Sequence, residues 1–403
     1  MAPRMTPDDP NIHASYRIQA NRLFPGGGEA PLLDQIIEIS DGVISRILPL
    51  ADVRDAADGP AAFHHFEIVA PGFIDLQING AGGAMFNDTP DMPTLACMAA
   101  AAGKGGTCHL LPTFITAPGT SYMAALDAVA AWDGPEILGI HLEGPFLSRK
   151  KPGIHPPDAI RPMTDDDVAR LCAFAGGFAG RVMLTLAPEE ATPAHLQQLH
   201  DAGIILFAGH TDASAQEMSR AVDHGLRGVT HLFNACSQIT AREPGVVGAA
   251  FIDNRLVAGI IADGHHVDPD NLALAARLMS GRLCLVSDSM SSYGSTLDSF
   301  SVAGRQVSLI DGRLQADDGT LGGAHLGLDE AVRTMVTRAG VSLAEALDMA
   351  SGIPANILGL ADSHGRIEPG RPASLSCLDE TLGACAVIVG GVLSANGSGA
   401  DGS

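Results

Sequence analysis

Lysine is scarce in this sequence: the chain of 403 residues contains only Lys104, Lys150 and Lys151. The formal net charge is −22, so acidic side chains far outnumber basic ones. A protein that binds nucleic acids in general needs a basic surface that displaces counterions from the phosphates. The charge therefore excludes general nucleic-acid binding, and any site for an anion is expected to use arginine or histidine.

Paired cysteine motifs and long apolar segments are also missing. The number of cysteines, seven, is odd and none form a C-x-x-C pair, so we expect buried free thiols in a reducing compartment. Residues 1–11 lack the apolar core of a signal peptide, and no uncharged run approaches the roughly 18 residues of a membrane span. The sequence predicts a cytoplasmic protein that does not associate with membranes.

The chain does contain a regular succession of strand and helix patterns, and its 46% of hydrophobic residues suffice for a large core. Eight strand-like apolar runs occur at 66–79, 106–115, 136–146, 181–189, 204–212, 228–235, 257–267 and 282–290. Helical patterns separate most of them. Expected helix starts and helix-ending glycines are Thr164, Thr192, Ser214 and Asp268, and Gly203, Gly225 and Gly281. This alternation predicts an α/β fold, a (β/α)₈ barrel of the TIM type.

The two ends of the chain have a different pattern. Residues 14–24 and 34–49 alternate apolar and polar around three glycines at 26–28, and short strands joined by Gly and Pro turns return near the C-terminus. We expect the two ends to pair as a small β-sandwich. The predicted organisation is residues 1–65 and 363–403 for this β domain, with a frayed tail, and residues 66–362 for the barrel.

Three of the apolar runs stop at residues that bind metals: Glu143 in GIHLEGPF, His210 in IILFAGHTDA and His231 in GVTHLFNA. A catalytic zinc typically takes three protein ligands from rigid elements and leaves a fourth position for water, so the set predicts a metal-dependent hydrolase. The alternative, that each residue merely ends a strand, is weaker for three together. Asp288 follows the run LCLV and is expected to act as the general base; its alternative role is a turn or helix cap.

The motifs HLEGP, GHTDA, THLFNA, REPG, DGHHV and VSD occur in this order, and the set resembles the N-acetylglucosamine-6-phosphate deacetylase family of the amidohydrolase superfamily. The resemblance extends over nearly the whole chain. It implies that Glu143, His210 and His231 bind one divalent metal ion, with Zn²⁺ expected first and Fe²⁺ or another divalent ion as alternatives. The metal would polarise the amide carbonyl of N-acetyl-D-glucosamine 6-phosphate and activate water, while Asp288 acts as base and then as acid. The implied products are D-glucosamine 6-phosphate and acetate, and the implied assembly is a homodimer with a shared phosphate site.

The resemblance also implies a set of substrate contacts. They are Ile154, His155, Asn234, Ala235, Arg242, Asp263, His266, Leu321, Gly322 and Gly323. Arg242 offers a fork of donors that matches a phosphate, and His266 would add a second contact. His155 would hydrogen-bond the acetyl carbonyl unless it is an ordinary core or surface histidine. Asn234 would either donate its amide to the ligand or cap its own loop.

Some features of the superfamily are absent. Many amidohydrolases carry His-x-His after the first barrel strand, where this chain has Gln77-Ile78-Asn79, and neutral amides are poor ligands for such a cation. No lysine lies at the end of the fourth strand, TLAPE, to bridge two metals, and Glu189 there is expected to be a helix-start acid. One metal ion is therefore favoured over two.

The segment after HLFNA also departs from the family pattern, since it reads CSQIT where the resemblance leads us to expect Met-Ser-Pro.

Two other functions stay open at this point. A cyclic-amide hydrolase of the dihydroorotase or hydantoinase type uses the same barrel, but the missing His-x-His pair and bridging lysine count against it. A non-catalytic sugar-phosphate sensor would keep the pocket without the reaction. Such a protein would have no need of Asp288 beside the three ligands.

Overall fold

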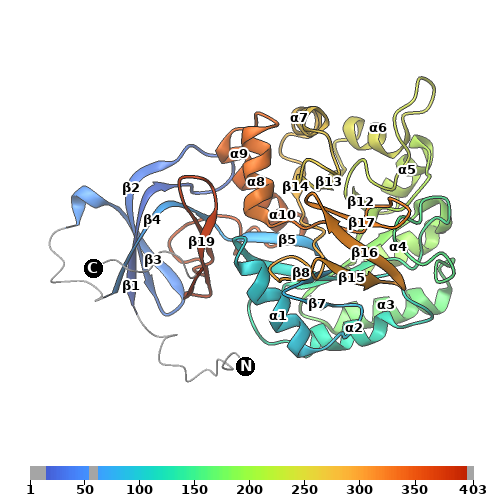
Figure 1. Cartoon of the computed structure of the whole chain (residues 1–403), viewed down its shortest axis with the longest axis horizontal. Coiled ribbons are helices and arrows are strands. Elements are labelled where there is room, and N and C mark those ends of the chain that lie inside the picture. Colours follow the sequence, from blue (N-terminus) through green and yellow to red (C-terminus); the bar gives the residue numbers. More distant parts are fainter. Residues whose placement is uncertain (1–14, 54–61, 397–403) are drawn as a thin grey trace.

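A barrel of eight parallel strands forms the body of the protein (Figure 1). The computed structural model describes residues 15–53 and 62–396. The order of strands around the barrel is β14-β13-β12-β11-β10-β9-β8-β5. Their bounds are β5 (Phe73–Ile78), β8 (Thr107–Ile115), β9 (Gly139–Glu143), β10 (Arg181–Leu186), β11 (Ile205–Ala208), β12 (Leu226–Val229), β13 (Val257–Ile260) and β14 (Leu283–Leu285). Each strand overlaps one of the eight apolar runs, so the predicted barrel is confirmed.

The barrel closes between its first and last strands, just where the polar residues begin. The backbone N–H of Asn79 donates to the carbonyl of Ser289 at 2.8 Å, and the N–H of Asp288 donates to the carbonyl of Gln77 at 2.8 Å. These two bonds lie at the carboxyl ends of β5 and β14. They therefore place Asp288 directly beside Gln77 and Asn79.

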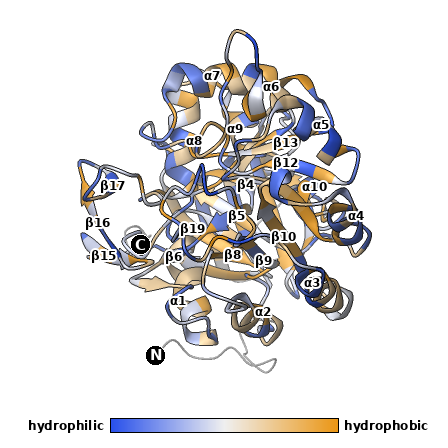
Figure 2. Cartoon of the chain, turned by 90° about the vertical axis from the view of Figure 1, so that its right-hand side faces the viewer, coloured by the Kyte–Doolittle hydropathy of each residue, from blue (hydrophilic) through white to orange (hydrophobic). Residues whose placement is uncertain are grey.

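Helices form an outer ring around the barrel strands (Figure 2). Their bounds are α1 (Met92–Gly103), α2 (Tyr122–Ala130), α3 (Asp165–Gly177), α4 (Pro193–Asp201), α5 (Ala215–Val222), α6 (Gly245–Ile252), α7 (Pro269–Leu278), α8 (Leu328–Thr337), α9 (Leu343–Ala350) and α10 (Gly352–Ile357), with short 3₁₀ turns η1 (Leu50–Asp52) and η3 (Pro188–Glu190). Four predicted starts are confirmed by side chains that accept a backbone N–H of the first turn: Thr164, Thr192, Ser214 and Asp268. The predicted end glycines are left-handed, with φ of 82° at Gly203, 98° at Gly225 and 72° at Gly281.

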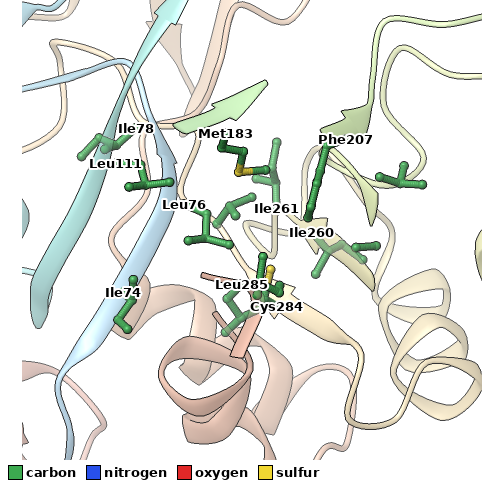
Figure 3. Close-up of a cluster of buried hydrophobic side chains, with 14 of the residues drawn as sticks. Ile74, Leu76, Ile78, Leu111, Met183, Phe207, Ile260, Ile261, Cys284 and Leu285 are labelled. Carbon is green, nitrogen blue, oxygen red and sulfur yellow. The ribbon is translucent and has the colours of Figure 1, made fainter. Parts of the chain in front are cut away.

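Buried apolar side chains from several barrel strands pack against one another (Figure 3). Those labelled in the close-up are Ile74, Leu76, Ile78, Leu111, Met183, Phe207, Ile260, Ile261, Cys284 and Leu285. None of them is more than 2% exposed. Close packing of this kind resists small displacements, so the strand ends that carry the polar residues stand on a rigid base.

A second sheet combines strands from the two ends of the described chain, in the order β20-β19-β18-β4-β1-β2-β3. Its strands are β1 (Tyr16–Leu23), β2 (Leu32–Ser40), β3 (Val43–Pro49), β4 (Ala62–Pro71), β18 (Leu375–Leu378), β19 (Ala384–Val389) and β20 (Val392–Ala395). The hydroxyl of Tyr16 donates to the carbonyl of Gly391 at 2.9 Å, so the sheet curves back on itself around a separate apolar core. The predicted sandwich is thus one continuous, curved sheet.

The first apolar run, 66–79, contributes residues to a strand in each of the two sheets. It contains the end of β4 and all of β5, with Gly72 between them. A Cβ atom at Gly72 would lie 2.8 Å from Sγ of Cys108, so only glycine lets the chain pass this close to β8. Because β4 belongs to the small sheet, that sheet extends past the boundary predicted at residue 65.

A small antiparallel sheet follows β14 and was not predicted. It consists of β15 (Ser299–Val302), β16 (Arg305–Ile310) and β17 (Arg313–Ala316); a second short hairpin, β6 (Gly80–Ala81) and β7 (Ala84–Met85), follows β5. Val302, Val307 and Leu314 form a local core with Ile154 and Met290. The added sheet therefore packs against one side of the barrel mouth.

Two further expectations concern the ends of the chain and its helices. The predicted frayed tail comprises residues 396–403. The prediction is wrong for Asn396, whose backbone N–H donates to the carbonyl of Cys385 and whose side chain donates to those of Lys104 and Ala384. Residues 397–403 lie outside the described residues, as do residues 1–14. Within the described parts, no helix is both long and apolar enough to cross a membrane.

Candidate metal centre and substrate pocket

Three predicted ligands converge at the carboxyl ends of neighbouring strands. Glu143 is the last residue of β9, while His210 and His231 follow β11 and β12. Oε1 of Glu143 lies 3.1 Å from Nε2 of His210 and 3.0 Å from Nε2 of His231, and the two imidazole nitrogens are 3.1 Å apart. Metal–ligand bonds of roughly 2.0–2.1 Å in a tetrahedral site separate the ligand atoms by roughly 3.4 Å. The triangle is therefore close to the size that one metal ion requires.

The backbone is unusual at the ends of these strands. His210, His231 and Asp288 have φ values of 48°, 31° and 50°, in the left-handed region that residues other than glycine seldom adopt. Such conformations cost on the order of 1–3 kcal/mol each and cluster at functional sites. The sharp turn after each strand directs the side chain to the barrel mouth.

His210 is held in the orientation that a metal ligand needs. Its Nδ1 donates to the carbonyl of Lys151 at 3.0 Å, which turns Nε2 toward the centre. Glu189, expected to be a helix-start acid, lies in η3 and supports the next turn: its carboxylate accepts the hydroxyl of Thr211 and, at 2.7 Å, the N–H of Asp212. The donor chemistry and these supports fit a bound divalent ion.

The charges of the three ligands depend on one another. Burial alone would raise the pKa of Glu143, but hydrogen bonds and charges from His210 and His231 hold it well below its usual value. Burial alone would lower the pKa of His231, and the carboxylate of Glu143 instead raises it. Glu143 is therefore ionised and supplies the negative charge that a cation requires.

Asp288 lies beside the ligands and is held by two amides. Its Oδ1 accepts from Nδ2 of Asn79 at 2.7 Å and from Nε2 of Gln77 at 3.2 Å. The amide of Gln77 also reaches both oxygens of Glu143, at 3.3 Å each. Burial, and then the negative charge of Glu143, raise the pKa of Asp288 to about 6. Gln77 and Asn79 occupy the position of the His-x-His pair. Amides are poor metal ligands, and here they orient the carboxylates of Glu143 and Asp288 instead.

His155 faces the same centre from a different loop. Its Nε2 is 3.9 Å from Oε2 of Glu143, its ring centroid is 4.2 Å from that of His210, and its Nδ1 is 2.8 Å from the hydroxyl of Thr116. Ligand atoms of Glu143, His155 and His210 lie within 4.8 Å of one another. The closer spacing of His231 makes it the better third ligand. Burial, and then the neighbouring His210, lower the pKa of His155 well below its usual value, so it is neutral.

These residues open into a pocket of about 410 Å³, a volume typical of small-molecule sites. Predicted substrate residues among its lining are Ile154, His155, Asn234, Ala235, His266, Leu321 and Gly323. The added β15–β17 sheet contributes through Ile154, which packs against Val307 and Leu314. The structure therefore brings together most of the residues that the sequence motifs suggested.

Three predicted substrate residues do not line this pocket. Asp263 lies behind His266 and binds its Nδ1 at 2.7 Å; burial alone would raise the pKa of Asp263, but the bond to His266 lowers it. Gly322 lies against Val307. Arg242 is exposed on the loop before α6 and does not line this pocket.

Other lining residues had not been predicted as contacts. They are Asn79, Ile115, Lys150, Lys151, Pro152, Gly153, Ile261, Met290 and Thr320. The KPGIH motif could have indicated the two lysines, because they lie five and four residues before His155 in the sequence. Met290 and Thr320 carry no such local signal, since their place depends on how the segment after β14 folds back.

A larger cavity, of about 760 Å³, lies elsewhere. It is lined by residues such as Trp132, Phe174 and Phe178, near the amino ends of β9 and β10. Barrel enzymes carry out their chemistry at the carboxyl ends of the strands. Its mostly apolar lining and its position both leave the smaller pocket as the candidate active site.

Comparison with known proteins agrees with this geometry. Residues 68–394 match the model of the Amidohydrolase family. N-acetylgalactosamine-6-phosphate deacetylase from Shewanella sp. (strain ANA-3) is 37% identical over 366 residues, 89% of this chain and 91% of that protein. N-acetylglucosamine-6-phosphate deacetylase from Haemophilus influenzae is 35% identical over 89% of this chain and 94% of that protein. The crystal structure of N-acetylglucosamine-6-phosphate deacetylase from Pasteurella multocida has a TM-score of 0.89 and 33% identity, covering 95% of this chain and all of that one (100%). The resemblance expected from the motifs is confirmed: the chain belongs to the amidohydrolase family.

Proposed function

We propose that this protein is a metal-dependent deacetylase that hydrolyses N-acetyl-D-glucosamine 6-phosphate to D-glucosamine 6-phosphate and acetate. The observation that carries the proposal is the triangle of Glu143, His210 and His231, with sides of 3.0–3.1 Å, beside the buried carboxylate of Asp288. Relatives of this chain with nearly the same length are named as deacetylases of amino-sugar 6-phosphates. The site supplies what amide hydrolysis needs.

Glu143, His210 and His231 would hold the divalent ion. When bound, the ion supplies Lewis-acid polarisation of the acetyl carbonyl and an activated water molecule. Two imidazoles with one carboxylate form a ligand set known from catalytic zinc sites, and the same set also suits Fe²⁺. We propose one ion per chain, Zn²⁺ in the first place, because Gln77 and Asn79 are neutral amides and therefore poor ligands for a second ion.

The protein's own groups would carry the proton. Asp288 accepts the proton of the attacking water and then donates it to the departing amine, so the sugar leaves as a neutral amine. A pKa of about 6 suits a group that must serve in both forms near neutral pH. Asn79 and Gln77 fix the carboxylate by bonding the same oxygen, Oδ1, which leaves Oδ2 for the water.

His155 would orient the substrate. Nδ1 of the neutral ring lies 2.8 Å from the hydroxyl of Thr116, and in the tautomer with its proton on Nε2 the ring donates that proton to the acetyl oxygen. That hydrogen bond strengthens as negative charge develops on the oxygen in the transition state. His266, whose Nδ1 is bonded to Asp263, presents Nε2 to the pocket for a second polar contact.

The first test is turnover by the purified protein loaded with zinc. We expect acetate release from N-acetyl-D-glucosamine 6-phosphate with kcat/KM in the usual enzymatic range, about 10⁴ M⁻¹ s⁻¹ or above. Plain N-acetylglucosamine should be a poorer substrate by at least about tenfold, since it lacks a charged contact. Tight binding of the sugar phosphate without release of acetate would instead identify a sensor, and turnover of cyclic amides alone a hydantoinase-type enzyme.

N-acetyl-D-galactosamine 6-phosphate is a second candidate substrate. The observation in its favour is the Shewanella relative at 37% identity, which is named for that sugar. The two sugars differ only in the orientation of one hydroxyl group. Measuring kcat/KM for both in the same assay decides which of them the pocket prefers.

We also propose that the active assembly is a homodimer in which Arg242 serves the pocket of the other copy. Arg242 lies on the loop between β12 and α6, which projects from the helices around it (Figure 1). The carboxylate of Glu243 ties the base of this loop to the N–H groups of Ala215 and Gly245, at 2.8 and 2.9 Å. An exposed guanidinium on an anchored loop is well placed to reach a phosphate in a second subunit.

Arg242→Ala should therefore lower kcat/KM for the phosphorylated sugar relative to plain N-acetylglucosamine by roughly ten- to a hundredfold. A more specific test mixes the Arg242→Ala protein with the Asp288→Asn protein, so that subunit exchange forms mixed dimers. In a mixed dimer, one pocket contains Asp288 from one chain and Arg242 from the other, so activity should return above that of either variant alone. No gain after subunit exchange would mean that Arg242 does not act across an interface.

We further propose that the protein is located in the cytoplasm. All seven cysteines are free in the structure, and the cytoplasm keeps such thiols reduced. Fractionation of cells that express the protein would test this.

A further inference from the structure

The loop before His155 carries Lys150 and Lys151 to the mouth of the candidate active site, where both line the pocket. They are two of the three lysines in the chain. Among the described residues of the pocket lining, no other lysine or arginine occurs. Two of the three lysines of this acidic protein therefore lie next to each other at the mouth of the pocket.

The backbone of this loop is fixed to a proposed metal ligand. The N–H of Ser148 donates to the carbonyl of His210 at 2.9 Å, and the carbonyl of Lys151 accepts from Nδ1 of His210 at 3.0 Å. Gly153 also packs tightly, since a Cβ there would lie 3.0 Å from the ring of His210. The lysines therefore start from a rigid base beside the catalytic centre.

Their ammonium groups differ in how they are engaged. Nζ of Lys150 lies 3.2 Å from Oδ2 of Asp212, and its side chain is 76% exposed. Nζ of Lys151 is 3.9 Å from Oδ1 of the same carboxylate, too far for a hydrogen bond, and its side chain is only 34% exposed. The two ammonium groups thus share the carboxylate of Asp212, and only that of Lys150 lies within hydrogen-bond distance of it.

Outside the proposed metal centre, the charged groups of the pocket lining other than the lysines are mainly carboxylates. Glu143 and Asp288 both line the pocket with carboxylates, and the whole chain has a formal charge of −22. A phosphate dianion that binds away from the metal centre is favoured by a cation at the rim of the pocket. Arg242 is exposed outside its own pocket, which leaves the two lysines as the cations that the chain itself offers.

We infer that Lys151, assisted by the more exposed Lys150, is a contact for the phosphate group within the chain's own pocket and determines the preference for phosphorylated substrates. This inference rests on the proposed deacetylase function. Lys151 donates to the phosphate from its ammonium group, and Lys150 raises the local potential. The phosphate thereby anchors the sugar, with its acetamido group toward His155 and Asp288.

The test compares Lys151→Met with Lys104→Met on N-acetyl-D-glucosamine 6-phosphate and on plain N-acetylglucosamine. Lys104 is the only other lysine; it is exposed at the end of α1, so its replacement removes the same charge away from the pocket. Lys151→Met should lower the ratio of the two kcat/KM values by roughly ten- to a hundredfold, mainly through KM. Lys104→Met should leave the ratio unchanged, and Lys151→Arg should restore most of it.

Ionic strength gives an independent readout. Added salt should lower kcat/KM of the unmodified enzyme for the phosphorylated sugar, and this slope should flatten in Lys150→Met/Lys151→Met. Metal content of each variant is measured in parallel, and Lys151→Gln replaces Lys151→Met if the latter does not fold.

The outcomes separate this inference from the proposed function. If the unmodified enzyme does not prefer the phosphorylated sugar, the proposed function is wrong in naming a sugar 6-phosphate as the substrate. An unmodified enzyme with that preference, together with a Lys151→Met variant that keeps it, overturns the inference alone. Equal losses on both substrates with loss of metal would show that Lys151 only supports His210, which also overturns it.

Discussion

Asp288→Asn is expected to lower kcat by roughly 10²-fold or more while folding and metal binding persist. Asparagine has the same shape, and its Oδ1 still accepts from Asn79 and Gln77, so the hydrogen bonds at 2.7 and 3.2 Å survive. What disappears is the group that takes a proton from water and returns it to the amine. The measurement is kcat with saturating substrate, alongside metal content and Tm.

Asp311→Asn is the matched control for this variant. Asp311 is exposed and, like Asp288, has a φ of 50°, so the substitution removes the same charge from the same backbone conformation outside the pocket. Its kcat should equal that of the unmodified enzyme. A near-normal kcat in Asp288→Asn would mean that another residue of the pocket acts as the base.

The second large effect is expected at Glu143. The unmodified protein should bind one metal equivalent per chain, and removal of that metal by a chelator should abolish turnover. Glu143→Gln keeps the shape but offers a neutral amide, a poor ligand for a divalent ion. Changes to groups that merely support ligands cost about 10–100-fold, so loss of the ligand itself should exceed about 100-fold in activity and leave the protein largely metal-free.

Glu190→Gln removes the same charge from an exposed position in η3 and serves as the control. It should retain both the metal and the activity. Two metal equivalents per chain, both needed for activity, would contradict the single-ion site, as would full metal content in Glu143→Gln.

The barrel could be predicted because its signals are local. Each buried parallel strand is a short apolar run, and helix caps such as Thr164 and Ser214 act within one turn of their own helix. The ligands could be predicted for a related reason: the carboxyl ends of parallel strands meet at one face, so polar residues that end such runs converge. Roles for individual substrate residues came from the resemblance of the motifs.

Other features depend on contacts between distant segments. The split of the run 66–79 at Gly72 arises from its packing against Cys108, which no local pattern reveals. The β15–β17 sheet has ordinary short strands, and its place at the pocket follows from the core that it shares with Ile154. Likewise, the sequence could not indicate that Arg242 lies outside its own pocket.

By itself, then, the sequence determined the fold class, the strand ends that carry Glu143, His210, His231 and Asp288, and the family. These follow from periodicity and short ordered motifs, which are properties of neighbouring residues. Only the tertiary structure decided that Gln77 and Asn79 hold a carboxylate, that Glu189 supports the loop of His210, and that Lys151 lines the pocket. The physical reason is that hydrogen bonds and electrostatic interactions act over a few ångströms in space, and they join residues that are distant in the sequence, such as Gln77 and Asp288, which are 211 positions apart.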